Sequence, residues 1–458
     1  MQPPYLEGSF APTDAEHDAA LTVLEGEVPA DLAGAYVRNG PNPRFAPMGR
    51  HHWFDGDGML HAVRFRDGEA RYRSRYVRTD DFEAEGEAGE ALFRGLLEPA
   101  KENPTGRYKD SGNTDVLPFG GELLTLHYMA GKAWRVDRES LETRGALAWP
   151  GKLSAHAKVD PRTGELLFFD YGPKAPFLTW GTLRPDGTHQ VVDLGLEAPT
   201  FPHDMAFTER FAILMEPPVT LSLEHARRWR WGVVEDLERP FRFHLSPRAG
   251  GEARTFEAAG CYLYHVCDAW EERDEEGGSV VLVGFRCPRL FPEPDPADGP
   301  YRVMMANLRL RATLHRWRFD LRTGACAEEP LDDLNAEFPT VDDRRMGQGA
   351  RFAYAVTIPT DRRRVRFDGL VKHDLRTGAR RGVFAWGENR FGSEAPFAPR
   401  VGSTGDDDGY LVSFVHEEGA ATSEVVVLHA ETMELACRLA VPHRVPLGFH
   451  ACWAGDPA

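Results

Sequence analysis

The chain has 458 residues, with 54 lysines and arginines against 71 aspartates and glutamates, and a formal net charge of −17. A field of that sign repels phosphate, which argues against nucleic acid as a partner. No run of about 18 apolar residues occurs, and the N-terminus lacks a basic segment followed by an apolar one. We therefore expect no transmembrane helix, no signal peptide and a cytoplasmic location.

Turn signals separate short strand-like runs along the chain. DPRTGE (160–165) and DLRTGA (320–325) begin with Asp and supply Gly near the end of the turn. Neighbouring runs are apolar or alternating, as in SVVLVGFRC (279–287) and SEVVVLHA (423–430), which is typical of β-strands. The pattern predicts many strand–turn–strand units.

These units follow one another without a regular strand–helix alternation, so we predict an all-β fold. A propeller suits this length, since each blade needs roughly 40 to 50 residues. No linker rich in Ser, Gly or Pro divides the chain, and we expect a single domain over residues 1–458. Helical patterns are few, and the best one covers residues 83–100.

Four of the seventeen histidines lie in mostly apolar runs separated by 47, 62 and 185 residues. Such intervals give no local ligand pair like the i, i+4 pair of a helix. Each histidine could be a core residue with satisfied hydrogen bonds. Alternatively, strands from separate blades could converge and present one imidazole each to Fe, Zn, Cu or Ni. The four are His156 in SAHAKVD, His203 in FPHDMAF, His265 in YLYHVCDAW and His450 in VPLGFHACW.

The words around these histidines are more specific than their spacing. PYLEGSFAP (4–12), GAYVRNGPNP (34–43) and HHWFDGDGMLHAV (51–63), followed by the four histidine motifs in order, resemble the carotenoid cleavage oxygenase family. That family includes the apocarotenoid oxygenases, the lignostilbene dioxygenases and the retinoid isomerase. The resemblance runs from about residue 4 to residue 454. It implies a seven-bladed β-propeller with a helical and loop cap over one face, and Fe(II) held by His156, His203, His265 and His450.

The family also uses three glutamates that bind the outer nitrogens of the imidazoles. By resemblance, Glu337 in NAEFPTV and Glu394 in FGSEAPF match two of them. The family commonly reads LLALWEGG at the third, whereas this chain reads LLTLHYMAG, so Tyr128 or Met129 takes the place of the glutamate. Neither side chain adds negative charge at neutral pH. We expect iron to be retained, with His203 lacking its usual anionic partner.

The resemblance implies a non-haem Fe(II) dioxygenase that cleaves a conjugated C=C bond into two carbonyl products. Its partners would be O₂ and an apolar polyene such as a carotenoid or apocarotenoid. Thr114 in GNTDV matches a threonine near the vacant iron position of some relatives. No GxSxG or other hydrolase signature competes with this interpretation.

Two alternatives remain open. Lignostilbene-type relatives often carry Lys-Glu at the positions of His127 and Tyr128, and that lysine helps to hold a phenolic oxygen. Its absence favours an apocarotenoid, but Tyr108 in GRYKD matches the tyrosine of the stilbenoid group, so a stilbenoid or phenylpropene substrate stays possible. A polyene-binding propeller without catalysis is the second alternative. LFRGLL (92–97) and RLFPEP (289–294) are candidates for peripheral membrane contact.

Overall fold

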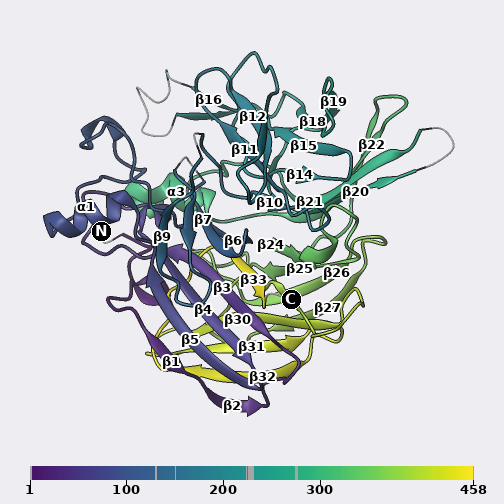
Figure 1. Ribbon diagram of the computed structural model, residues 1–458. Coiled ribbons are helices and arrows are strands. Elements are labelled where there is room, and N and C mark those ends of the chain that lie inside the picture. The colour runs from purple at the N-terminus through teal and green to yellow at the C-terminus, as the bar shows by residue number, and fades with distance from the viewer. Residues whose placement is uncertain are drawn as a thin grey trace. The chain divides into compact units, whose positions relative to one another are not determined.

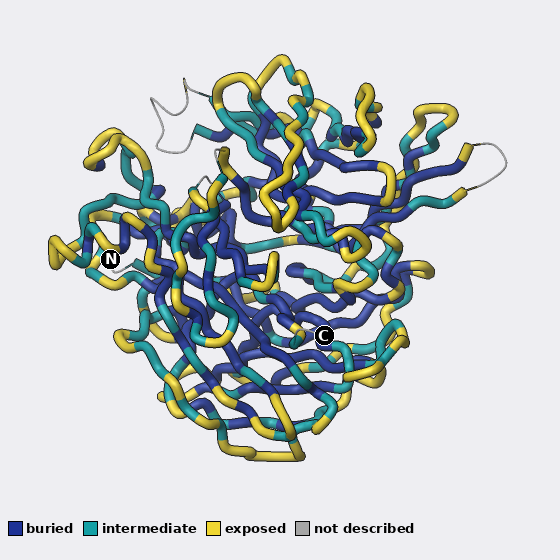
Figure 2. Tube along the Cα trace, viewed as in Figure 1, coloured by how far each residue is buried: buried dark blue, intermediate teal, exposed yellow. Residues whose placement is uncertain are grey.

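The structure is a computed structural model that describes residues 3–128, 131–149, 151–222, 224, 232–273 and 277–456. Within this described part, seven sheets of four to six strands and one two-stranded ribbon carry the fold (Figure 1). Buried residues follow the strands and exposed residues gather at the turns (Figure 2). The strands form where β-branched and aromatic residues recur, because such side chains pack well on a pleated surface. The prediction of an all-β, seven-bladed β-propeller is confirmed.

Contacts group the chain into two compact units. The first unit comprises Met1–Ala155, Phe367–Leu370 and Gly382–Ala458. Its three sheets have the strand orders β1-β5-β4-β3-β33, β6-β7-β8-β9 and β2-β32-β31-β30-β28, with β29 also paired to β30. The strands are β1 (Asp18–Ala20), β2 (Thr22–Gly26), β3 (Gly34–Pro41), β4 (Gly58–Arg66), β5 (Glu69–Tyr76), β6 (Asp115–Phe119), β7 (Glu122–Leu126), β8 (Trp134–Val136), β9 (Thr143–Ala146), β28 (Arg390–Phe391), β29 (Phe397–Pro399), β30 (Gly409–Glu417), β31 (Ser423–His429), β32 (Leu435–Val441) and β33 (Ala451–Gly455).

The second unit comprises His156–Arg366 and Val371–Arg381. It carries the sheets β10-β11-β12-β13, β14-β15-β18-β19 and β20-β21-β22-β23, the ribbon β16-β17, and most of the sheet β24-β25-β26-β27. The strands are β10 (Lys158–Val159), β11 (Leu166–Tyr171), β12 (Leu178–Leu183), β13 (His189–Asp193), β14 (Ala206–Phe207), β15 (Phe211–Glu216), β16 (Val219–Leu221), β17 (Val233–Glu235), β18 (Phe241–Pro247), β19 (Arg254–Ala258), β20 (Tyr262–Glu272), β21 (Ser279–Cys287), β22 (Thr313–Asp320), β23 (Cys326–Pro330), β24 (Ala336–Val341), β25 (Phe352–Thr357), β26 (Gly369–Asp374) and β27 (Arg380–Ala385).

Segments near both ends of the described residues are paired in the sheets of the first unit. The last strand, β33, pairs with β3 in the register Arg38↔Ala451 to Gly34↔Gly455. The early strand β2 pairs with β32, near the C-terminus. A terminal segment that is paired in a sheet is held against fraying. His450, which directly precedes β33, therefore lies at an anchored position.

The helices are short. In the described part, α1 covers Asp80–Ala88 and α3 covers Arg302–Asn307, with 3-10 turns at Gly8–Phe10, Trp53–Asp55, Ala100–Glu102, Pro296–Tyr301 and Asp343–Arg345. The Thr79 hydroxyl caps α1 by accepting the Phe82 N–H at 3.1 Å, and Gly89 ends it with φ of +74°. The prediction of one helix over 83–100 was wrong, because the left-handed glycine stops the helix after Ala88.

No helix of the described residues is long and apolar enough to cross a membrane. A cap over one face and a single domain over the whole chain stay predictions.

Candidate metal centre

Three of the four predicted imidazoles meet inside the second unit. His156, His203 and His265 are all buried, and one ring nitrogen of each lies within 4.8 Å of the others. Their ring centroids are 4.8 to 5.1 Å apart. Three neutral imidazoles at this spacing form a donor set that suits Fe, Zn, Cu or Ni. The residues present therefore fit a first-row divalent metal.

Irregular backbone aims two of these rings. His156 precedes β10 with φ of +66°, a left-handed conformation that few non-glycine residues adopt and that often marks a functional position. His265 lies in β20 where the pairing with β21 shifts register between Leu263 and Val266. Such a bulge redirects a side chain locally. The alternation of a regular strand is thus broken at the position where an imidazole must turn towards the cluster.

Glu337 fixes the tautomer of one of the rings. Its side chain is fully buried in β24, and its Oε2 lies 2.5 Å from His265 Nδ1. The Phe338 N–H also donates to this oxygen. Because a carboxylate only accepts, Nδ1 of His265 carries the proton and Nε2 carries the lone pair that a metal needs. The arrangement agrees with the role that the resemblance implies for Glu337.

Asp204 was missed in the sequence analysis, although it stands in the FPHDMAF word. It is 2% exposed and follows His203 directly. Its Oδ2 accepts the Val266 N–H at 2.8 Å, next to His265, and its Oδ1 pairs with Lys158 Nζ at 2.7 Å, two residues after His156. One carboxylate therefore ties together the three segments that carry the imidazoles. The sequence offered only an acid within the FPHDMAF motif as a signal, since its burial and its partners are visible in the structure alone.

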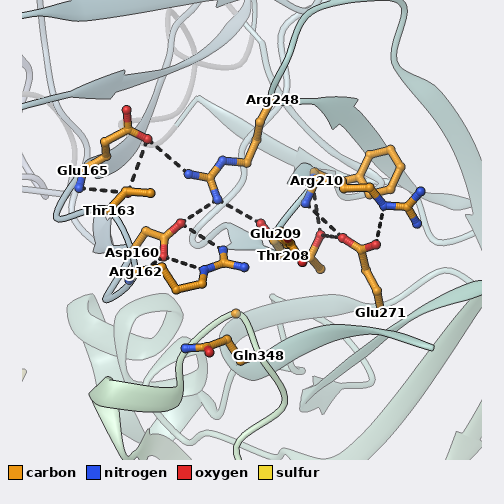
Figure 3. Close-up of polar contacts among 12 residues, drawn as sticks. Asp160, Arg162, Thr163, Glu165, Thr208, Glu209, Arg210, Arg248, Glu271 and Gln348 are labelled. Atoms are coloured by element: carbon orange, nitrogen blue, oxygen red, sulfur yellow. Dashed lines mark hydrogen bonds and ion pairs between the residues drawn. The ribbon is translucent and has the colours of Figure 1, made fainter. Parts of the chain in front are cut away.

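A second network of polar contacts joins residues that follow the three histidines by four to six positions (Figure 3). Arg248 Nη1 donates to Asp160 Oδ2 at 2.7 Å, just after β10, and to the Thr208 carbonyl at 3.0 Å, just after β14. The Thr208 hydroxyl donates to Glu271 Oε1 at 2.8 Å, near the end of β20. The network therefore links the three segments that follow His156, His203 and His265 to one another.

The fourth predicted imidazole lies in the first unit with its own carboxylate. His450 is 7% exposed, and its Nδ1 is 3.2 Å from Glu394 Oε1. The Ala451 N–H donates to Glu394 Oε2 at 2.5 Å. Burial raises the pKa of the Glu394 carboxyl above its ordinary value, although His450 and the Ala451 N–H oppose the shift. Like His265, His450 thus presents Nε2 as its lone-pair nitrogen.

Thr114 and Tyr128 contact the segment that carries His450. The Thr114 carbonyl accepts the His450 N–H at 3.3 Å, and the Thr114 hydroxyl accepts the Tyr128 N–H at 3.3 Å. Tyr128 is 4% exposed, and burial raises the pKa of its phenol well above the ordinary value, so it stays neutral. It therefore supplies no charge in place of the missing glutamate. Met129, the other candidate for that place, lies outside the described residues.

A pocket in the first unit joins the two remaining predicted residues. Phe54 packs against Phe449, the residue before His450, with ring centroids 5.0 Å apart. The Tyr108 hydroxyl donates to the Glu98 carbonyl at 3.1 Å. The lining of the pocket is mixed. Phe54, Phe93 and Leu96 are apolar, Tyr108 and His127 are polar, and Arg50, Asp55, Asp57, Glu85, Arg94 and Lys109 carry charge.

Comparison with known proteins identifies the family. The family model described as "Retinal pigment epithelial membrane protein" matches residues 10–455. Carotenoid 9,10(9',10')-cleavage dioxygenase 1 of Arabidopsis thaliana is 33% identical, with 99% of this chain and 90% of the relative covered. A lignostilbene dioxygenase structure from Pseudomonas brassicacearum is 28% identical, with a TM-score of 0.87 and 99% of both chains covered. A cobalt-substituted apocarotenoid oxygenase from Synechocystis is 25% identical, with a TM-score of 0.81 and 97% of both chains covered. With whole-chain similarity and the histidine motifs in agreement, the chain belongs to the carotenoid cleavage oxygenase family and is an oxygenase.

Proposed function

We propose that the chain is a non-haem Fe(II) dioxygenase that cleaves a conjugated C=C bond of a carotenoid or apocarotenoid into two carbonyl products. One observation carries the proposal: three buried imidazoles lie within 4.8 Å of one another in a member of this family. Imidazole suits iron, and the cobalt form of the Synechocystis relative supports a first-row divalent metal in that protein.

His156, His203, His265 and His450 would hold the iron. Bound there, iron would supply the binding and activation of O₂. Glu337 and Glu394 keep the Nδ1 protons in place, so the Nε2 lone pairs point away from the carboxylates. Burial of all four rings keeps bulk water out. Because Tyr128 is neutral, the site carries one negative charge fewer than the family's usual three glutamates would supply.

Two aromatic residues in the lining of the pocket of the first unit, Phe54 and Phe93, support contact with an apolar part of a substrate, beside a lining that also carries charged residues. Phe54 could pack against a polyene ring, and Thr114 lies at the backbone of His450. The chain's own role would be to place one double bond in a fixed position, which lowers the entropic cost of the reaction. His127 stands where the stilbenoid relatives often have a lysine.

A stilbenoid or phenylpropene substrate is the second candidate, favoured by the similarity to the lignostilbene dioxygenase and by Tyr108 in the pocket. Lys109 also lines this pocket, but its Nζ pairs with Asp57 and lies 2.5 Å from Glu85 Oε2. Burial alone would lower the pKa of Lys109; the two carboxylates outweigh it and raise that pKa. Since this charge is already balanced, Lys109 is a poor substitute for a lysine that holds a phenolate.

Product identity tests the proposal. The iron-loaded protein would be incubated in air with an apocarotenal, with resveratrol and with isoeugenol, and the carbonyl products identified by mass spectrometry. We expect cleavage of the apocarotenal and none by His156→Ala. Aromatic aldehydes from resveratrol or isoeugenol, with no product from the apocarotenal, would favour the second candidate. Full iron occupancy without O₂ consumption on any polyene would favour a non-catalytic binder.

We propose a cytoplasmic location with peripheral membrane contact for substrate uptake, because long polyenes partition into lipid. In the two candidate segments, the partly exposed Phe93 and Phe291 would make this contact, whereas Leu96 and Leu290 are buried. Flotation with liposomes checks this contact, and complete absence of the protein from the lipid fraction would contradict it.

A further inference from the structure

We propose that Arg38 is a positioning residue that holds the segment carrying Glu394 and the segment carrying His450 in one fixed arrangement. The inference rests on the proposed function, because it assigns Arg38 a role towards a proposed iron ligand. Arg38 lies in β3, and no role for it follows from the family's histidine and glutamate motifs.

The guanidinium bridges two segments that are far from β3 in sequence. Its Nη1 donates to Ser393 Oγ at 2.7 Å, directly before Glu394. Its Nη2 donates to the Pro446 carbonyl, four residues before His450. Because the planar guanidinium fixes the angle between these two bonds, it fixes the two segments relative to each other.

Arg38 is only 1% exposed, and its cost of burial is high. The two hydrogen-bond partners of its guanidinium, the Ser393 hydroxyl and the Pro446 carbonyl, are neutral, and its Cζ lies 5.3 Å from the centroid of the Phe414 ring. Burying a charge without an ion pair is unfavourable, so such a group is retained where its hydrogen bonds are needed. The bonds to Ser393 and Pro446 are those that the Arg38 guanidinium makes.

Other residues of β3 contact the same two segments. The Tyr36 hydroxyl donates to the Glu394 carbonyl at 3.1 Å. The Asn39 N–H donates to the His450 carbonyl at 2.9 Å, and the Phe449 N–H donates to the Asn39 carbonyl at 2.9 Å. β3 thus contacts both the segment carrying Glu394 and the segment carrying His450, and Arg38 is its one side chain that bonds to both.

Gly448 shows how closely Arg38 approaches the segment that carries His450. A Cβ at position 448 would lie 2.9 Å from Arg38 Nε and 2.8 Å from the Asn39 carbonyl oxygen. Both distances are shorter than ordinary contacts, so a larger residue would push the guanidinium or the strand away. The sequence PLGFH therefore leaves room for Arg38 two residues before the imidazole.

Three variants test the proposal. Arg38→Met removes both hydrogen bonds, and Arg38→Lys keeps the charge but lacks the two diverging donors of the guanidinium. Val427→Ala is the control, because it changes a fully buried position in the core of the same unit. Hydrogen exchange of the metal-free proteins is measured over 391–397 and 443–450, and Fe(II) affinity is measured without oxygen. We expect both Arg38 variants to exchange at least tenfold faster in both segments and to bind Fe(II) on the order of tenfold more weakly. Val427→Ala should lose stability without either effect.

Equal exchange in Arg38→Met and Val427→Ala, at matched loss of stability, would overturn the proposal. Should the Arg38 variants not fold, Ser393→Ala removes one acceptor only, and we expect faster exchange over 391–397 alone; unchanged exchange there would equally overturn it. If the wild type binds no Fe(II), the proposed function fails. The exchange data still decide whether Arg38 positions the segments that carry Glu394 and His450.

Discussion

Replacing Glu337 probes the bond between a carboxylate and an imidazole of the cluster. Glu337→Gln retains an oxygen that can accept from His265 Nδ1 but removes the negative charge; Glu337→Ala removes both. The wild-type contact is 2.5 Å long and fully buried, which favours a strong interaction. Loss of such a partner typically weakens metal binding 10- to 100-fold, or about 1.4 to 2.8 kcal/mol. We expect Gln near the lower value and Ala near the upper one.

The assay is anaerobic titration of the metal-free protein with Fe(II), with a competing chelator to bring the affinity into range. Asp332→Asn is the control, because it alters a part-buried carboxylate–imidazole contact of the second unit outside the cluster, in which Asp332 Oδ2 lies 2.6 Å from His373 Nε2. This control should bind Fe(II) like the wild type. Equal affinities for wild type, Glu337→Gln and Glu337→Ala would refute the reasoning.

Three further predictions concern the supports of the site. Asp160→Asn should lower the free energy of unfolding by about 2 kcal/mol at pH 7, because it weakens a part-buried, charge-assisted contact with Arg248. Burial alone would raise the pKa of Asp160, but hydrogen bonds from Arg162 and Arg248 lower this pKa below its ordinary value. The stability that the wild type gains from this carboxylate should therefore decrease as the pH falls below about 4. A difference in unfolding free energy between wild type and Asp160→Asn that stays constant in urea from pH 7 to pH 3 would contradict this prediction. Asp204→Asn, which loses the ion pair with Lys158, should weaken Fe(II) binding on the order of tenfold in the same titration, and an unchanged affinity would remove Asp204 from the account. Deleting residues 450–458 should abolish stoichiometric iron and lower Tm, because β33 is lost from its pairing with β3; a truncated protein that keeps one iron per chain would exclude His450 as a ligand.

Local sequence motifs singled out histidines that the structure brings together, but not the residues that contact their segments. SAHAKVD, FPHDMAF and YLYHVCDAW singled out His156, His203 and His265, which the structure brings together. Asp204 stood in one of these words and was missed, since its importance comes from contacts with Val266 and Lys158, remote in sequence. Periodicity describes one segment at a time and carries no information about such partners.

The fold likewise has features that local sequence predicts and features that depend on remote pairing. Strand-like runs and turns predicted an all-β fold, but the number of blades came from family resemblance, because β3 pairs with β33 more than 400 residues away. Pairing at that separation leaves no local pattern. The end of α1 at Gly89, in contrast, was within reach of sequence reasoning, since glycine commonly ends helices in the left-handed conformation.

The central claim is that four imidazoles from separate segments share one iron. X-ray absorption at the iron edge, on protein reconstituted with Fe(II) and assayed for metal content, tests it most directly, because imidazole rings scatter in a way that allows them to be counted. The account predicts one iron per chain with four imidazole ligands, falling to three in His450→Ala. Iron bound with the same imidazole count in the wild type and in His450→Ala would contradict it.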